Sequence, residues 1–173
     1  MRIISGQWRG RTLIAPEGEA TRPTADRTRE ALFSMLTSRL GSFEALRVAD
    51  LFAGTGALGL EALSRGAGAC VFVERDHAAL AALKANIARL GATGAEIRAQ
   101  AAEGFAGGPF DIVFLDPPYR SGLGVKVLPR LALEPGCWAS IETAFDEDVE
   151  VPGFAVDAVR RHGKAKLTLL RKL

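Results

Sequence analysis

A short segment in the second half of the chain, FLDPPY at residues 114–119, places a carboxylate, two prolines and a tyrosine directly after large apolar residues. Proline cannot donate to a sheet ladder, so a strand that reaches Pro117 must end there. Asp116 and the Pro117 carbonyl can each accept one N–H of a nucleobase amine, whose lone pair is otherwise delocalised into the ring. Pro118 helps to fix these acceptors, and Tyr119 offers a flat face for a base taken out of its stack. The segment therefore predicts a bracket that prepares an exocyclic amine to attack a methyl group.

A second segment, DLFAGTGALGLEAL, joins a predicted strand to a predicted helix through Gly54, Gly56 and Gly59. Glycines at such a junction let a ligand lie against bare backbone at a helix N-terminus. The spacing also fits the dinucleotide pattern, with Glu74 about 20 residues after the loop, so an NAD-dependent oxidoreductase is an alternative. Asp50 lies beside the loop, and its carboxylate would favour a cationic sulfonium or amino group over an anionic pyrophosphate. The loop and the bracket together therefore favour methyl transfer over hydride transfer.

The elements that must position these residues alternate between strand and helix. Apolar runs typical of strands are RVADLF, CVFVER, AEIRAQ, FDIVFLD and CWASIET, and helical patterns fall at ALGLEALSRG, DHAALAALKANIARLG and 123–133. The last segment reads as two strands joined at residues 162–164. This order predicts an α/β, Rossmann-like fold with a mostly parallel twisted sheet, helices on both faces and a C-terminal antiparallel hairpin. Ligands of such sheets bind outside the carboxyl ends of the strands, where both chemical segments fall.

The N-terminal part, residues 1–45, is interpreted as a small extension of the main domain at 46–173. RIISGQWRGRTLIAP looks like two short strands around a glycine-rich turn, and a helix is expected from about Thr24. Arginines in this extension are candidates for nucleic-acid contact, helped by the aromatic ring of Trp8. These candidates are Arg9, Arg11, Arg22, Arg27 and Arg29.

Charge is unevenly distributed along the chain, although the net charge is only +2. Residues 1–29 hold six arginines against three acidic residues, and residues 159–173 hold six basic residues and no acid. Basic ends around an acidic middle indicate a polyanionic partner, with ordinary solvated termini as the alternative.

Cellular location and metal content are also constrained. The two cysteines, Cys70 and Cys137, lie in apolar runs without His or Cys neighbours at metal-ligand spacing, so buried free thiols are expected. No apolar run reaches the length of a membrane span, and the first residues lack a signal-peptide pattern. A cytoplasmic protein without metal is expected.

The chain resembles class I S-adenosylmethionine-dependent methyltransferases, and more narrowly the bacterial small-subunit (16S) rRNA guanine-N2-methyltransferase D family. The resemblance covers essentially the whole chain. It rests on RIISGQWRGR, RPTADRTREALFSML, DLFAGTGALGLEALSRGA, FVERD and FLDPPY.

The resemblance implies a Rossmann-like methyltransferase fold, S-adenosylmethionine as cofactor and small-subunit rRNA as partner, free or within the 30S particle. Asp116 to Tyr119 would hold the target guanine amine. The residues at or beside the cofactor would be Asp50, Ala53, Gly54, Gly56, Glu74, Arg75 and Gln100. Family members usually carry Asp or Asn near the end of the third core strand, where this chain offers Gln100, whose longer side chain can still accept a hydrogen bond from adenine.

Several alternatives keep the same mechanism with another acceptor: adenine N6 in DNA or RNA, or a protein glutamine amide. A non-enzymatic RNA-binding module would explain the charge but would leave DPPY without a purpose. The modified nucleotide, the choice between naked rRNA and the particle, and the oligomeric state stay open at this point.

Overall fold

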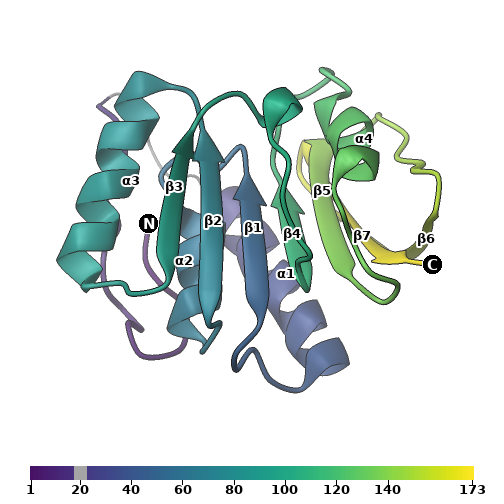
Figure 1. The fold of residues 1–173 in the computed structure, drawn as a ribbon. Coiled ribbons are helices and arrows are strands. Elements are labelled where there is room, and N and C mark those ends of the chain that lie inside the picture. The colour runs from purple at the N-terminus through teal and green to yellow at the C-terminus, as the bar shows by residue number, and fades with distance from the viewer. Residues whose placement is uncertain (18–22) are drawn as a thin grey trace.

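The computed structural model describes residues 1–17 and 23–173 and is built on a seven-stranded sheet of order β3-β2-β1-β4-β5-β7-β6 (Figure 1). Its parallel strands are β1 (Arg47–Leu51), β2 (Ala69–Glu74), β3 (Ala95–Ala99), β4 (Ile112–Leu115) and β5 (Trp138–Ala144). An antiparallel hairpin, β6 (Phe154–His162) and β7 (Ala165–Lys172), completes the sheet, with β7 paired to β5. The predicted α/β class and the C-terminal hairpin are therefore confirmed.

Helices cover both faces of the sheet, and each face has its own hydrophobic core. The first core lies under α1 (Pro23–Leu40), α2 (Ala57–Ser64) and α3 (His77–Leu90), and the second under α4 (Leu123–Val127). Figure 1 shows α1 and α2 behind the sheet. Phe114 belongs to the first core and Leu115 to the second, because successive strand residues point to opposite faces. A strand covered on both faces needs a continuous apolar run, as β4 has.

The helix expected over 123–133 is shorter than predicted. The α-helix α4 ends at Val127, and a 3₁₀ turn, Leu128–Arg130, follows it. Pro129 explains the change, because proline lacks the N–H that an α-helix needs and its ring clashes with the preceding turn. The helix predicted from about Thr24 begins at Pro23.

The N-terminal arm, residues 1–15, does not form the two predicted strands. It has a single antiparallel bridge between Arg2 and Thr12, and its buried side chains, among them Ile3 and Trp8, belong to the first core. Trp8 is only 9% exposed, so its ring packs inside the protein instead of forming a surface cluster with the neighbouring arginines.

Three buried polar side chains, which we call the arm anchors, replace the missing sheet ladder. They are Glu61 and Ser64 on α2 and Asn86 on α3. The Glu61 carboxylate accepts hydrogen bonds from Ile4 N at 2.8 Å and Ser5 N at 3.0 Å. Ser64 Oγ accepts from Trp8 N at 3.0 Å, and Asn86 Oδ1 accepts from Ile14 N at 2.6 Å. The anchors thus hold the arm by its backbone.

Both cysteines are buried free thiols, as the sequence predicts. Among the described residues, no helix combines the length and apolar character that crossing a membrane requires.

Candidate active site

The candidate site lies where the parallel strands end at their carboxyl edge. Asp50 is in β1, Glu74 closes β2, Asp116 follows β4 and Glu142 is in β5. These strands are consecutive neighbours in the sheet, so residues distant in the sequence meet along one edge. The sequence prediction that the glycine loop and the DPPY segment share this edge is confirmed.

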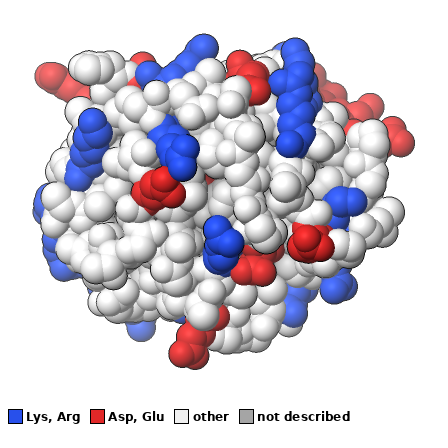
Figure 2. All heavy atoms as spheres, viewed as in Figure 1, with Lys and Arg blue, Asp and Glu red and all other residues white. Residues whose placement is uncertain are grey.

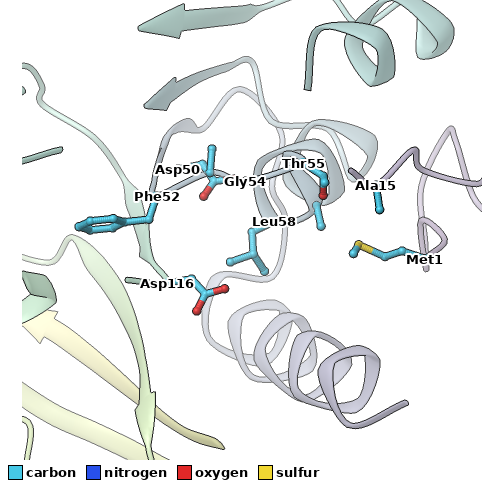
Figure 3. Close-up of a pocket in the computed structure, with 10 residues that line it drawn as sticks. Met1, Ala15, Asp50, Phe52, Gly54, Thr55, Leu58 and Asp116 are labelled. Atoms are coloured by element: carbon cyan, nitrogen blue, oxygen red, sulfur yellow. The ribbon is translucent and has the colours of Figure 1, made fainter. Parts of the chain in front are cut away.

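Three cavities converge on Asp116. The first, of about 510 Å³, extends from Glu74 and Gln100 to Pro117 and Pro118. The second, of about 220 Å³, is lined by Asp50, Gly54 and Asp116 among others, and Figure 3 shows these residues gathered around it. The third, of about 140 Å³, lies between α1 and strands β5 and β7. Asp116 lines all three, so a ligand in any one of them comes near this carboxylate.

The glycine loop leaves bare backbone at the cavity wall. Gly54 has φ +59°, and a Cβ placed on it would meet no atom within 4 Å. Gly59, by contrast, packs α2 tightly on β2, since a Cβ there would lie 2.4 Å from the Phe72 ring and 2.7 Å from Cys70 Sγ. Gly54 therefore leaves space for a ligand at the cavity wall, whereas Gly59 allows α2 to pack closely on β2.

Glu74 shapes the loop that it faces. Its Oε1 accepts a hydrogen bond from Gly54 N at 2.7 Å, and its Oε2 accepts from Arg75 N and Asp76 N at 2.9 and 2.8 Å. Asp76 in turn caps α3 by accepting from Ala79 N at 2.9 Å. The carboxylate thus ties the end of β2 to the glycine loop while it lines the largest cavity.

Asp50 is a buried carboxyl group without a positive partner among the described residues. It is 1% exposed, and its Oδ2 accepts a hydrogen bond from Gly59 N at 2.9 Å. Burial raises the pKa of Asp50 to about 8, the hydrogen bond from Gly59 opposes this rise, and the charge of Glu74 adds to it. A cation bound in the adjoining cavity would favour the ionised form.

Asp116, the first residue of the bracket, lies in a crowded electrostatic setting. Its side chain is open to the cavities, although protein atoms surround it on the other sides. This crowding limits its hydration and raises its pKa, and the nearby carboxylates of Glu142 and Asp50 raise it further.

The rest of the bracket is held by β5. Tyr119 is 43% exposed, and its hydroxyl donates to Glu142 Oε2 at 2.9 Å, which orients the exposed ring. Pro117 and Pro118 line the largest cavity beside Asp116. Glu142 thus has a structural role at the site through its bond to Tyr119.

Gly56, also expected at the cofactor, lines none of the three cavities; it precedes α2 and packs against the core, where a Cβ would lie 2.5 Å from the Leu83 side chain. Three other expected cofactor residues do lie at the cavities. Gln100 and Arg75 line the largest one, and Ala53 lines the second. The Gln100 side-chain amide makes a 3.5 Å contact with the Ala101 carbonyl, and Ala102 and Glu103 also line the cavity after the end of β3. Among the described residues, no group of three or more His, Cys, Asp or Glu side chains could hold a metal ion.

The arginines expected at nucleic acid occupy different environments. Arg9, Arg11 and Arg27 are exposed, and Arg11 donates to the Arg89 carbonyl of α3 at 2.9 Å. Arg22 lies outside the described residues. Arg29 departs from the expectation of an exposed contact, because it is only 6% exposed and lines the third cavity.

Asn86 on α3 is buried although its side chain is polar. It is 1% exposed, and its amide donates to the carbonyls of Ile14 and Thr55 at 2.9 and 3.0 Å. It therefore connects the N-terminal arm to the glycine loop. Figure 2 shows basic and acidic groups interspersed on the face of Figure 1, so no continuous basic patch covers the described residues in that view.

Comparison with known proteins identifies close relatives. A family model described as conserved hypothetical protein 95 matches residues 1–171. The chain is 42% identical over 154 residues to ribosomal RNA small subunit methyltransferase D of Escherichia coli K12, covering 87% of this chain and 75% of that relative. It is 38% identical over 163 residues to the Haemophilus influenzae protein of the same name, covering 88% and 83% of the two chains. The solved structure of the putative methyltransferase yhhF from Escherichia coli superposes with a TM-score of 0.87 at 35% identity, covering 99% of this chain and 97% of that one. These similarities confirm the resemblance predicted from the motifs.

Proposed function

Since the chain belongs to the conserved hypothetical protein 95 family, we propose that it is an S-adenosylmethionine-dependent methyltransferase that modifies the exocyclic N2 amine of a guanine in small-subunit ribosomal RNA. The observation that carries the proposal is the convergence of three cavities on Asp116, because transfer requires the cofactor and the acceptor amine to meet at one point. The reaction forms a bond between N2 and the methyl carbon and breaks the bond between that carbon and sulfur. The amine also loses one proton.

The cavities fit S-adenosylmethionine in both shape and charge. Glu74 and Gln100 would hold the ribose and the adenine in the largest cavity, with Arg75 at its rim. Gly54 offers an open stretch of backbone for the connection to the second cavity. There, Asp50 offers a buried carboxyl group whose ionised form a cation would stabilise. When bound, the cofactor supplies an electrophilic methyl group.

The chain's own residues prepare the acceptor amine. The Asp116 carboxylate and the Pro117 carbonyl accept the two N–H groups of N2, which favours the positive charge that develops on this nitrogen. Asp116 has a raised pKa and can therefore receive the proton that the amine releases. Tyr119, fixed by its bond to Glu142, provides a surface on which the extruded base can stack.

Contact with RNA is assigned to the extension, residues 1–45, and catalysis to residues 46–173. The exposed Arg9, Arg11 and Arg27 would bind phosphates, whereas the buried Arg29 can contact only a group that enters the third cavity. The substrate is rRNA, free or within the small subunit, which would place the enzyme in the cytoplasm.

Methylation with labelled cofactor tests the proposal. The purified protein is offered naked small-subunit rRNA, assembled small subunits and duplex DNA, and the products are digested to nucleosides. We expect label in N2-methylguanosine from one or both RNA substrates, at one position that primer extension can map. Label found only in N6-methyladenosine, or in no nucleoside, would overturn the assignment.

A further inference from the structure

The third cavity has no role so far. Asp116 and Glu142 lie on its strand side, and Arg29 and its ion-pair partner Asp26 lie on its α1 side. Apolar side chains, including Leu32 and Leu167, complete the lining. A flat, polar ring with both donors and acceptors on one edge suits such a cavity.

Arg29, one of the residues that line this cavity, carries a buried donor without a partner in the described part of the chain. Its Nη2 donates to the Arg2 carbonyl at 2.7 Å and lies 3.4 Å from Asp26 Oδ1. Its Nη1 is buried and has no hydrogen-bond partner among the described residues. An unpaired buried donor is costly, so a ligand that presents an acceptor there would be stabilised.

Glu142 brings an acceptor close to the reacting amine. The Tyr119 hydroxyl occupies its Oε2 and fixes the carboxylate at the end of β5. Glu142 is also near enough to Asp116 to raise the pKa of that group. Two neighbouring carboxylates match a ligand edge that presents neighbouring N–H donors.

We propose that the third cavity receives the base-pairing edge of the target guanine and that Glu142 selects guanine by accepting its N1–H beside the N2 amine held at Asp116. Arg29 donates through Nη1 to the O6 carbonyl at the other end of this edge. This inference rests on the proposed function and names the residue that determines its base specificity. Adenine has an unprotonated N1 and no carbonyl, so it would face Glu142 with a lone pair and leave Arg29 without an acceptor.

The 2-aminopurine base keeps the N2 amine but has an unprotonated N1 and no O6, so it removes the partners of both Glu142 and Arg29, and the comparison of Glu142→Gln with the wild type on this base isolates Glu142. An RNA carrying guanine or 2-aminopurine at the mapped position is prepared by splinted ligation. The wild type should methylate the guanine RNA and reject the 2-aminopurine RNA by about 100-fold or more in kcat/KM, because a site built to bond an N–H rejects an analogue that lacks it. In Glu142→Gln, the amide oxygen can still accept from Tyr119, and the amide nitrogen can donate to an unprotonated N1.

We therefore expect Glu142→Gln to lose about 10- to 100-fold in kcat/KM on guanine RNA and to gain at least about tenfold on 2-aminopurine RNA relative to the wild type. The fluorescence of 2-aminopurine gives a second readout that needs no turnover, and the variant should bind that RNA more tightly than the wild type does. Cofactor affinity, measured by calorimetry, should be unchanged. The matched control is Glu150→Gln, an exposed carboxylate that lines none of the three cavities and should behave as wild type.

Three outcomes decide the proposal. Wild-type kcat/KM of Glu142→Gln on guanine RNA, or equal activity of variant and wild type on 2-aminopurine RNA, overturns it. If Tyr119→Phe reproduces the loss on guanine and Glu142→Gln shows no gain on 2-aminopurine, then Glu142 acts only by orienting Tyr119, and the proposal is wrong. Failure of the proposed function would look different, since the wild type itself would then place no methyl group on guanine N2.

Discussion

Cofactor binding should release a proton from Asp50. This carboxyl is 1% exposed and has a pKa of about 8, so it is mostly protonated at neutral pH before a ligand binds. S-adenosylmethionine carries a sulfonium and an amino group, and a cation in the second cavity would return the pKa of Asp50 towards the ordinary range of a carboxyl group. The pKa falls on binding, so binding strengthens as the pH rises towards 8 and levels off above it.

The magnitude of the effect follows from the Asp50 pKa of about 8. At pH 7 about a tenth of the free protein has Asp50 ionised, so each bound cofactor should release about 0.9 proton. If the ionised form alone binds well, the apparent Kd is about tenfold above its high-pH limit at pH 7 and about 100-fold above it at pH 6. These values are upper limits, because weaker coupling to the cation gives a shallower dependence.

Calorimetry in buffers of different ionisation enthalpy measures both the proton release and the Kd. Asp50→Asn is the matched variant, because its amide oxygen can still accept from Gly59 N but carries no titrating proton. The cofactor's own amino group titrates equally in both proteins, so the difference between them isolates Asp50. Identical pH dependence of Kd and identical proton release in the two proteins would refute the reasoning.

Four further predictions concern the cofactor, the amine, the RNA and the arm. Glu74→Ala should weaken cofactor binding about 10- to 150-fold in calorimetry, because the ribose diol loses a charged acceptor. Asp116→Ala should lower the single-turnover methylation rate by about 10²–10³, with cofactor affinity within a few fold, because it removes one preorganised acceptor. The double variant Arg9→Ala, Arg11→Ala should reduce the slope of log affinity against log salt by about 0.7 per lost contact with single-stranded RNA. Glu61→Ala should lower the free energy of unfolding in urea by about 3–5 kcal/mol, because it strands Arg65 and two backbone donors of the arm.

Each of these predictions has an outcome that contradicts it. Unchanged cofactor affinity in a folded Glu74→Ala protein would remove this residue from the cofactor site. A wild-type single-turnover rate in Asp116→Ala would end the amine-bracket mechanism. If the wild type and the double arginine variant have equal salt slopes, the arm does not contact RNA phosphates, and the basic β6–β7 hairpin becomes the better candidate for that contact. For Glu61, the control is Glu150→Ala on the surface, and equal unfolding free energies in the two variants would contradict an anchoring role.

The sheet and the position of the site at its carboxyl edge could be predicted because the acidic residues of the site lie at or near strand ends. In an α/β chain, a carboxylate after an apolar run is brought to the carboxyl edge whatever the exact length of the helices. Asp50, Glu74 and Asp116 were placed correctly at this edge by that rule alone. The end of α4 differed because a local residue, Pro129, interrupts a pattern whose apolar spacing continues.

What could not be predicted depends on contacts between distant segments. Asn86 looks like an ordinary polar residue on a helix, and its burial becomes visible only when Ile14, 72 positions earlier, packs against it. Arg29 is buried because the arm's Arg2 carbonyl folds over it. The bond from Tyr119 to Glu142 joins a turn that follows β4 to strand β5, 23 positions further along the chain. No local spacing encodes any of these pairings.

The arm anchors also determine which residues matter for docking the N-terminal arm. Glu61, Ser64 and Asn86 hold backbone N–H groups, and every residue except proline presents the same group. Exposed positions of the arm can therefore be exchanged for other residues without loss of these four hydrogen bonds. The side chains that hold the arm in place therefore lie in α2 and α3, and the exposed residues of the arm can vary without changing how it docks.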